Sequence, residues 1–208
     1  MTALATRMTF SEFLAWAEKQ PRGRYELWNG QAIKMAPERA RHAETKFAIA
    51  TALLAAIRRA GLECHMLPDG MTVRIDERTA FEPDALVYCG PKLSGDAVVV
   101  PAPVVVVEVA SPGTVSLDTG LKLEGYFSLP SVAHYLILDP ERRVITHHAR
   151  RKTIETAIIR DGEVILEPPG LVFPASEAFV GTALPFSSKS EGSGGGLRPS
   201  FPFGRKNG

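Results

Sequence analysis

Four consecutive valines, Val104 to Val107, stand out from the mixed hydrophobic and polar pattern along this chain. Such a run cannot alternate between core and solvent, so it predicts a strand buried on both faces, as in a parallel sheet covered by helices. The run ends at Glu108. An acid beside a buried strand needs a cation, a hydrogen-bond donor or a proton. Since α/β sheets bind ligands beyond their strand ends, Glu108 is the first candidate site residue, with a metal ion as the sharpest candidate ligand.

The first half of the chain alternates between helical and strand patterns. Residues 9–19 predict a short amphipathic helix capped by Thr9 or Ser11, and residues 24–28 and 31–35 predict a hairpin around Asn29-Gly30. Residues 39–60 predict the longest helix, which Gly61 ends. Its expected hydrophobic face is formed by Ala43, Phe47, Ala50, Leu54 and Ile57. Residues 63–67 and 71–75 flank a Pro-Asp-Gly turn and predict a second strand pair.

A strand, a helix and a strand follow one another around Glu108. The helix is expected over 117–127 and the next strand over 132–138. Short links between such elements are typical of a βαβ crossover, so the two strands should be parallel. Further strands at 144–149, 153–159 and 164–166 are expected to extend the edge of the sheet. The predicted fold class is therefore α/β, with a mixed sheet flanked by helices.

Other acids and one lysine fall near these elements. Pro83-Asp84 opens a short apolar run, which places Asp84 at the start of a strand that could bring its carboxylate to Glu108. Glu26 lies on the first strand of the predicted hairpin. Asp118, Lys122 and Tyr126 are spaced four residues apart, which places them along one stripe of the helix that follows Glu108.

Length and composition are ordinary for one soluble globular domain: 208 residues, 45% hydrophobic and 23% charged. We expect a domain over residues 1–182 and a disordered tail rich in Ser, Gly and Pro over 183–208. The two cysteines, Cys64 and Cys89, are too few for a disulfide framework, so buried thiols are expected. No apolar run is long enough to cross a membrane and no signal peptide is evident, which predicts a cytoplasmic protein.

A formal net charge of +1 gives no clear sign of a nucleic-acid binder, which usually carries a positive excess. Short basic clusters, such as Arg58-Arg59 and Arg150-Arg151-Lys152, are compatible with a phosphate backbone, yet such clusters are more often solvated faces. Charge therefore leaves the class of partner open.

An ordered set of short motifs resembles the Uma2 family of restriction-endonuclease-like proteins over roughly residues 9–180. The motifs are Tyr25-Glu26-Leu27, Arg41-His42, Pro83-Asp84, Val107-Glu108-Val109-Ala110-Ser111-Pro112, Asp118-x3-Lys122-x3-Tyr126 and Asp139-Pro140. The order of the set is more specific than any single motif. The resemblance implies a PD-(D/E)XK nuclease core, in which two acids bind Mg²⁺ and a nearby lysine positions or activates the attacking water.

The resemblance implies a role for each motif residue. Asp84 and Glu108 would bind Mg²⁺, with Mn²⁺ as an alternative ion, and Glu26 would complete the acidic cluster. Ala110 stands where the usual lysine would be, so Lys122 would replace it from the following helix. His42 could hydrogen-bond a phosphate or a carboxylate. The implied activity is hydrolysis of DNA phosphodiester bonds, and a homodimer is compatible with duplex cleavage.

Ordinary structural roles remain as alternatives. Lys122 and Asp118 also fit a surface ion pair on a helix, and Glu26 could face Lys34 across the hairpin. His42 fits a helix terminus and Tyr126 fits a packing position. Because Ala110 replaces the lysine and the net charge is near zero, a non-catalytic module that binds nucleic acid or protein is the second hypothesis.

Overall fold

The centre of the computed structural model is a six-stranded mixed sheet; the structure describes residues 7–110 and 118–179. Its strands lie in the order β10 (Ile154–Ile159), β9 (Val144–Arg150), β8 (His134–Asp139), β7 (Pro103–Val109), β6 (Ala85–Cys89) and β3 (Cys64–Pro68). Strands β7 and β8 are parallel, and helix α3 (Asp118–Ser128) lies between them in the chain. The predicted βαβ crossover and the α/β class are confirmed.

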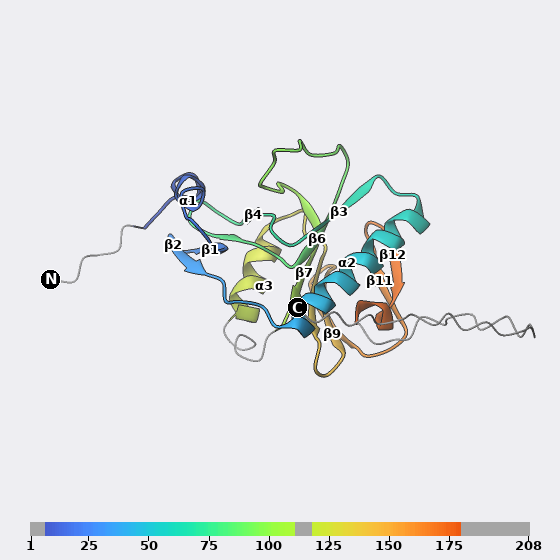
Figure 1. The fold of residues 1–208 in the computed structure, drawn as a ribbon. Helices are drawn as coiled ribbons and strands as arrows, with labels where there is room; N and C mark the ends of the chain where they lie inside the picture. The colour runs from blue at the N-terminus through green and yellow to red at the C-terminus, as the bar shows by residue number, and fades with distance from the viewer. Residues whose placement is uncertain (1–6, 111–117, 180–208) are drawn as a thin grey trace, which may run out of the picture.

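Helices cover both faces of this sheet. Alternate residues of the central strands point to opposite faces, so Val105 and Val107 join one hydrophobic cluster while Val106 joins the other. The first cluster contains the inward side chains of α2 (Ala40–Ala60), and the second contains those of α3. Figure 1 shows α2 and α3 on opposite sides of β6 and β7. The valine run is buried on both faces for this reason.

A smaller four-stranded sheet lies at the amino-terminal side of the molecule. Its order is β2 (Gln31–Lys34), β1 (Tyr25–Trp28), β5 (Ala80–Phe81) and β4 (Val73–Arg74). The predicted hairpin is confirmed, with Asn29 and Gly30 at positive φ as its turn requires. Helix α1 (Phe10–Ala17) packs beside β1, and Thr9 and Glu12 form a capping box at its start.

Two predictions of strand pairing are wrong. Strands β3 and β4 do not pair with each other, because β3 joins β6 in the large sheet and β4 joins β5 in the small one. The strand predicted at 164–166 does not extend the edge. It forms β11 (Glu163–Leu166), which pairs with β12 (Leu171–Pro174) in a separate hairpin.

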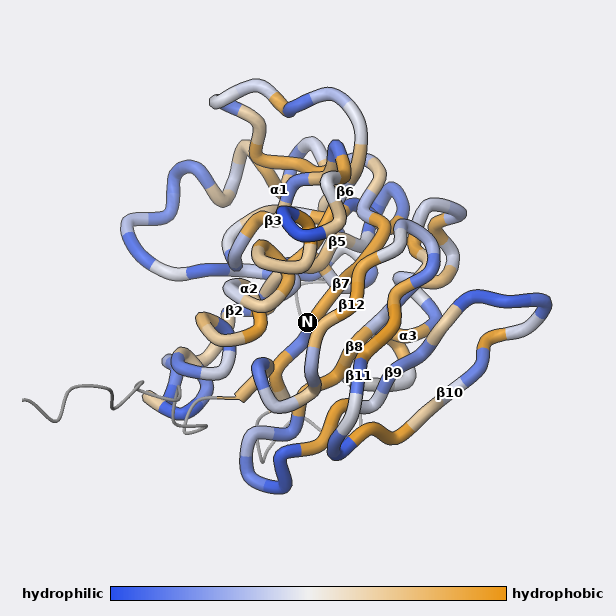
Figure 2. The backbone as a smooth tube through the Cα atoms, turned by 90° about the vertical axis from the view of Figure 1, so that its right-hand side faces the viewer, coloured by the Kyte–Doolittle hydropathy of each residue, from blue (hydrophilic) through white to orange (hydrophobic). Residues whose placement is uncertain are grey.

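The β11–β12 hairpin covers α2 and the large sheet. Its inward side chains are Val164, Leu166, Leu171 and Phe173, which are fully buried in the same cluster as α2. A 3-10 helix, η1 (Ala175–Ala178), follows it. Figure 2 shows the hydrophobic residues concentrated along β7, β8 and β12, with the β9–β10 ribbon extending to one side. The hairpin therefore covers the hydrophobic core and does not continue the sheet.

The predicted hydrophobic face of α2 is partly wrong. Phe47 is 73% exposed and Ala43 is also exposed, whereas Ile49, Leu53 and Ile57 are buried. The inward stripe instead begins with Lys46, which is only 7% exposed. Lys46 is buried because it contacts carboxylates, an interaction that a count of hydrophobic residues does not register.

Cys64 and Cys89 form a disulfide rather than the predicted pair of buried thiols. The two residues face each other in the antiparallel register of β3 and β6. Twenty-five residues separate them in sequence. The prediction failed because strand register, not cysteine count, brings the two sulfur atoms together.

Two histidines pair inside the sheet. His134 Nδ1 lies 2.8 Å from His147 Nε2, and His134 Nε2 lies 2.8 Å from the Pro168 carbonyl oxygen. Both side chains are buried. Burial lowers the pKa of each histidine to about 4. Both imidazoles are therefore neutral at pH 7 and connect β8 and β9 to the turn of the β11–β12 hairpin.

Across residues 7–110 and 118–179, none of the helices combines the length and the apolar character that a membrane span needs. The tail predicted over 183–208 lies outside the described residues.

Candidate active site

Asp84 and Glu108 stand opposite each other on neighbouring strands. The antiparallel register of β6 and β7 ends with the Ala85–Val107 pair, and the next step along it joins Asp84 to Glu108. The Asp84 amide donates to the Val107 carbonyl at 2.9 Å, which continues the pairing. Directly opposed residues in such a pair project to the same face. Asp84 lies just before β6, however, and its carboxylate bonds Lys46 on the α2 side, whereas Glu108 bonds residues of α3. The convergence of the two carboxyl groups therefore stays a prediction, which the effect of Asp84 on the pKa of Glu108 supports.

Glu108 is held by two donors from α3. Lys122 Nζ donates to its Oε1 atom at 3.0 Å, and the Tyr126 hydroxyl donates to the same atom at 2.8 Å. Burial raises the pKa of Glu108 to about 7, and the nearby carboxylates of Asp84 and Glu26 act in the same direction, while Lys122 opposes them. The Glu108 carboxyl therefore lacks enough positive charge around it to ionise as an exposed glutamate does.

Glu26 reaches the same lysine from the small sheet. Its Oε1 atom accepts hydrogen bonds from Lys122 Nζ at 2.9 Å and from the Glu82 amide at 3.0 Å. Its Oε2 atom accepts from the Trp28 indole at 3.0 Å. Lys34 lies opposite Tyr25 rather than Glu26, so the predicted alternative of a cross-strand pair is wrong. Glu26 is therefore a buried carboxylate that holds the Lys122 ammonium group in place.

Lys122 is the only side chain described here that joins Glu26 to Glu108. Burial alone would lower its pKa, but the two carboxylates outweigh this effect and raise it above the usual lysine value. Its Nζ also lies 5.6 Å from the centre of the Phe81 ring. Lys122 is therefore a fixed, charged ammonium group, whereas the predicted alternative was an exposed ion pair with Asp118. The Asp118 side chain lies outside the described residues.

Asp84 has a second set of partners on the α2 side. Its Oδ2 atom accepts from the Val109 amide at 2.6 Å, and its Oδ1 atom lies 2.7 Å from Lys46 Nζ. Lys46 Nζ also bonds Asp69 Oδ2 at 2.6 Å and contacts Glu38. Burial alone would lower the pKa of Lys46, and the carboxylates of Asp84, Asp69 and Glu38 raise it instead. Asp84 is thus paired with a cation of its own.

His42 lies between these acids at the start of α2. Its Nε2 atom is 2.6 Å from the Val109 carbonyl oxygen and 3.8 Å from Asp84 Oδ2. Its Nδ1 atom is 3.8 Å from Glu38 Oε1. His42 is therefore part of the site and not only a residue at a helix terminus.

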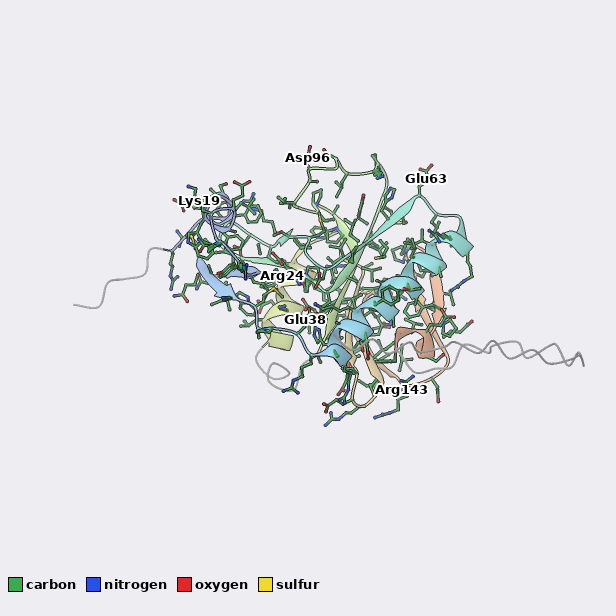
Figure 3. All side chains as sticks on the ribbon, in the orientation of Figure 1. Lys19, Arg24, Glu38, Glu63, Asp96 and Arg143 are labelled. Carbon is green, nitrogen blue, oxygen red and sulfur yellow. A yellow bond between two sulfur atoms is a disulfide. The ribbon has the colours of Figure 1, made fainter. Side chains whose placement is uncertain are left out.

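An open pocket of about 670 Å³ leads to this group. Arg24, Lys34, Glu38 and Asp69 are among its lining residues. Arg24 forms ion pairs with Asp69 at 2.5 Å and with Glu82 at 2.9 Å. In Figure 3, Arg24 and Glu38 lie near each other in the middle of the molecule, and Lys19 lies apart from them, just after α1. Two cationic side chains, Arg24 and Lys34, thus line the pocket, and Lys46 connects its residues Glu38 and Asp69 to Asp84.

Sequence analysis missed Lys46, Asp69 and Glu38. A partial signal was present, since His42 and Lys46 are four residues apart and so lie on one side of α2, and Glu38 comes just before that helix. The hydrophobic pattern drew attention instead to Phe47 and Ala43. Asp69 lies in the predicted Pro-Asp-Gly turn, where an aspartate is common for local reasons alone.

The donor set suits a hard divalent cation. Asp84 and Glu108 offer carboxylate oxygens, which are the ligands that Mg²⁺ prefers. The raised pKa of Glu108 shows that additional positive charge would favour its ionised form. Asp84, His42 and Glu38 also place one ligand atom each within 4.8 Å of one another. The residues present therefore fit a metal ion beside Asp84.

The mixed sheet, with an acid at each of two neighbouring strand ends, defines a restriction-endonuclease-like fold. Residues 10–176 match the sequence model of the Uma2 family, described as "Putative restriction endonuclease", and the chain belongs to this family. The crystal structure of "a putative nuclease" from Anabaena variabilis superposes with a TM-score of 0.64 at 15% identity. That likeness covers 83% of this chain and 97% of the other, and it supports the fold.

An uncharacterised protein from Synechocystis sp. is 27% identical over 133 residues. The alignment covers 64% of this chain and 68% of the relative. Its name assigns no activity, so the chemistry of this chain is argued from its own side chains.

Proposed function

We propose that this protein is a Mg²⁺-dependent endonuclease that hydrolyses DNA phosphodiester bonds. One observation carries the proposal: a buried lysine ammonium lies between Glu26 and Glu108, and Asp84, at the start of the neighbouring strand, is close enough for its carboxylate to raise the pKa of Glu108. Phosphodiester hydrolysis needs carboxylates that hold a cation and a nearby positive group that stabilises developing charge. Membership of the Uma2 family supports the same activity.

In this proposal Asp84 and Glu108 hold the ion. A bound divalent cation would neutralise charge on the scissile phosphate and help to generate the nucleophile. Tyr126 orients the Glu108 carboxyl group through its hydroxyl. Glu26 holds Lys122, and Lys122 orients the attacking water and stabilises negative charge on the phosphate oxygens. Lysine can act from a helix because only its terminal ammonium group must reach the reacting atoms.

The lysine at position 122 replaces one that PD-(D/E)XK proteins carry two residues after the second acid. Ala110 packs against the hydrophobic cluster under α3, and its amide donates to the Leu138 carbonyl at 2.7 Å. A small residue suits this position because the helix side of the sheet is filled by Tyr126 and its neighbours. We propose that α3 supplies the ammonium group that β7 does not.

DNA is the proposed partner, and the pocket beside Asp84 is its proposed approach. Arg24 and Lys34 line that pocket, where phosphate groups would meet positive charge. A homodimer and a cytoplasmic location remain predictions from the sequence.

Cleavage assays test the proposal directly. Duplex, single-stranded and branched DNA would be incubated with the full chain and Mg²⁺ or Mn²⁺. We expect Glu108→Gln and Lys122→Met each to reduce cleavage by about 100-fold or more, since each removes a charge that acts in the transition state. Lys19→Met is the matched control, because Lys19 is exposed just after α1, away from Arg24 and Glu38, and should leave activity unchanged. Cleavage that survives both site variants would refute the assignment.

A non-catalytic module that binds nucleic acid or protein is the second candidate. The observation that favours it is that each acid already pairs with a lysine, Asp84 with Lys46 and Glu108 with Lys122. Under this alternative, the wild-type chain would bind DNA or a protein partner without turnover in any metal. Fluorescence anisotropy beside the cleavage assay separates the two functions.

A further inference from the structure

We propose that Glu38, His42 and Asp84 form a second cation site, which shares Asp84 with the proposed site at Glu108 and selects a transition metal such as Mn²⁺ over Mg²⁺. The inference deepens the proposed function by adding a second ion beside it. It rests on that function for the role of the ion, while the binding itself can be measured separately.

The hydrogen bonding of His42 supplies the first argument. A carbonyl oxygen only accepts hydrogen bonds, so the 2.6 Å contact to Val109 requires the proton on Nε2. In the neutral ring this leaves a lone pair on Nδ1. Nδ1 is buried and has no hydrogen-bond partner. Metal-binding histidines have this arrangement, in which one ring nitrogen donates to a carbonyl and the other binds the ion.

The positions of the carboxylates supply the second argument. Glu38 Oε1 lies 3.8 Å from His42 Nδ1, and one ligand atom from each of the three residues falls within 4.8 Å of the other two. Neighbouring ligands of an ion with bonds of about 2.1 Å lie roughly 3 to 4 Å apart. Small rotations of Glu38, whose side chain is 34% exposed, would close the remaining gap.

Charge supplies the third argument. On this side of the site, four carboxylates (Glu38, Asp69, Glu82 and Asp84) face two cations, Lys46 and Arg24. Counted as ionised groups, they leave two negative charges, or one when Lys34 in the same pocket is included, and this negative excess favours a bound cation. Lys46 is a competitor for the same oxygens. If Asp84 and Glu38 turned toward an ion, the Lys46 ammonium group would still be paired with Asp69.

The chemistry of the ligand atoms determines which metal ion the site prefers. Mg²⁺ takes oxygen ligands almost exclusively, whereas an imidazole nitrogen suits first-row transition metals. A site with one imidazole and two carboxylates therefore favours Mn²⁺. Two ions that share a carboxylate are an arrangement found in several phosphodiester-cleaving enzymes.

Electron paramagnetic resonance with Mn²⁺ and the full, metal-free chain measures the number of bound ions. We expect two ions per wild-type chain and one in His42→Ala, Glu38→Gln and Glu108→Gln. Lys46→Met should raise the affinity of the His42 site about 10-fold or more, because a competing positive charge is gone. His148→Ala is the matched control, since His148 lies on β9 and bonds Thr156.

A second measurement examines the nitrogen atom itself. In ¹⁵N spectra of the histidine side chains, Zn²⁺ should shift the His42 Nδ1 resonance and leave that of Nε2 protonated. The same spectra show whether each variant is folded, and Glu38→Gln removes a ligand at the protein surface if His42→Ala does not fold.

The outcomes separate the two proposals. Mn²⁺ counts that are equal in wild type, His42→Ala and Glu38→Gln would overturn the second site, as would an unchanged Nδ1 resonance. One ion in wild type and none in His42→Ala would uphold this site and count against metal binding at Glu108. Two ions without DNA cleavage would uphold both metal sites and refute the nuclease activity.

Discussion

Acid should destabilise this protein through the buried pair of His134 and His147. Each imidazole is neutral in the folded chain, because burial lowers its pKa to about 4. In the unfolded chain both have a pKa near 6.5. A histidine with a lowered folded pKa contributes stability that is complete above pH 6.5 and is lost as the pH falls toward 4, because the unfolded state binds the proton first.

The size of the effect follows from the interval between the two pKa values. One pKa unit corresponds to about 1.4 kcal/mol, so a fall from pH 6.5 to 5 removes about 2 kcal/mol for one histidine. The upper limit for the pair is about 4 kcal/mol, a large share of a typical free energy of unfolding. Glu108 acts in the opposite direction over part of this range, because its folded pKa is raised to about 7.

Urea unfolding at pH 7.5 and pH 5 measures this loss when it is compared with the double variant His134→Gln/His147→Gln. The comparison cancels Glu108, which titrates in both proteins. We expect the variant to be less stable at pH 7.5 but to lose about 2 to 4 kcal/mol less than wild type on acidification, because it lacks both histidines. Equal losses in the two proteins would refute the reasoning, as would imidazole NMR signals that titrate near pH 6.5 in the folded wild type.

Two further predictions concern packing and cross-linking. In Gly125→Ala, the new methyl group would lie 2.8 Å from the Phe81 ring. We therefore expect the free energy of unfolding, measured in urea, to fall by about 1 to 3 kcal/mol, although alanine favours helices more than glycine does. A more stable variant would contradict the packing. Reducing the Cys64–Cys89 disulfide, or replacing both residues by serine, should cost about 2 to 4 kcal/mol, and unchanged unfolding in dithiothreitol would contradict this. Since disulfides are rare in cytosolic proteins, a protein isolated from cells with no free thiols would count against the predicted cytoplasmic location.

The local sequence pattern was sufficient to predict the βαβ unit and the elements that carry Asp84, Glu108, Lys122 and Tyr126. The valine run, the Pro83-Asp84 pair and the helix after Glu108 fix which strands are neighbours, and the register then sets Asp84 opposite Glu108. The stripe of Lys122 and Tyr126 faces Glu108 because both residues lie on the inward side of α3. These features depend on elements that follow one another directly along the chain, namely β6, β7, α3 and β8.

The other half of the site depends on contacts between distant segments. Lys46 is buried because Asp69 and Asp84, from separate segments of the chain, meet it, and the hydrophobic pattern of its own helix does not indicate this. The hydrophobic pattern therefore assigned Phe47 to the interior, although its side chain is 73% exposed. The pairing of Cys64 with Cys89 has the same origin, since only the β3–β6 register brings them together.

Helix α2 serves two purposes along a single inward stripe. Its first turns present His42 and Lys46 to Asp84, and its later turns place Leu53 and Ile57 between the large sheet and the β11–β12 hairpin. A change that rotates or shifts this helix to repack its far end would also displace the groups at its near end. Evolution and protein engineering are therefore free to vary mainly its outward side, where Phe47 offers a site for a spectroscopic label that leaves the chemistry undisturbed.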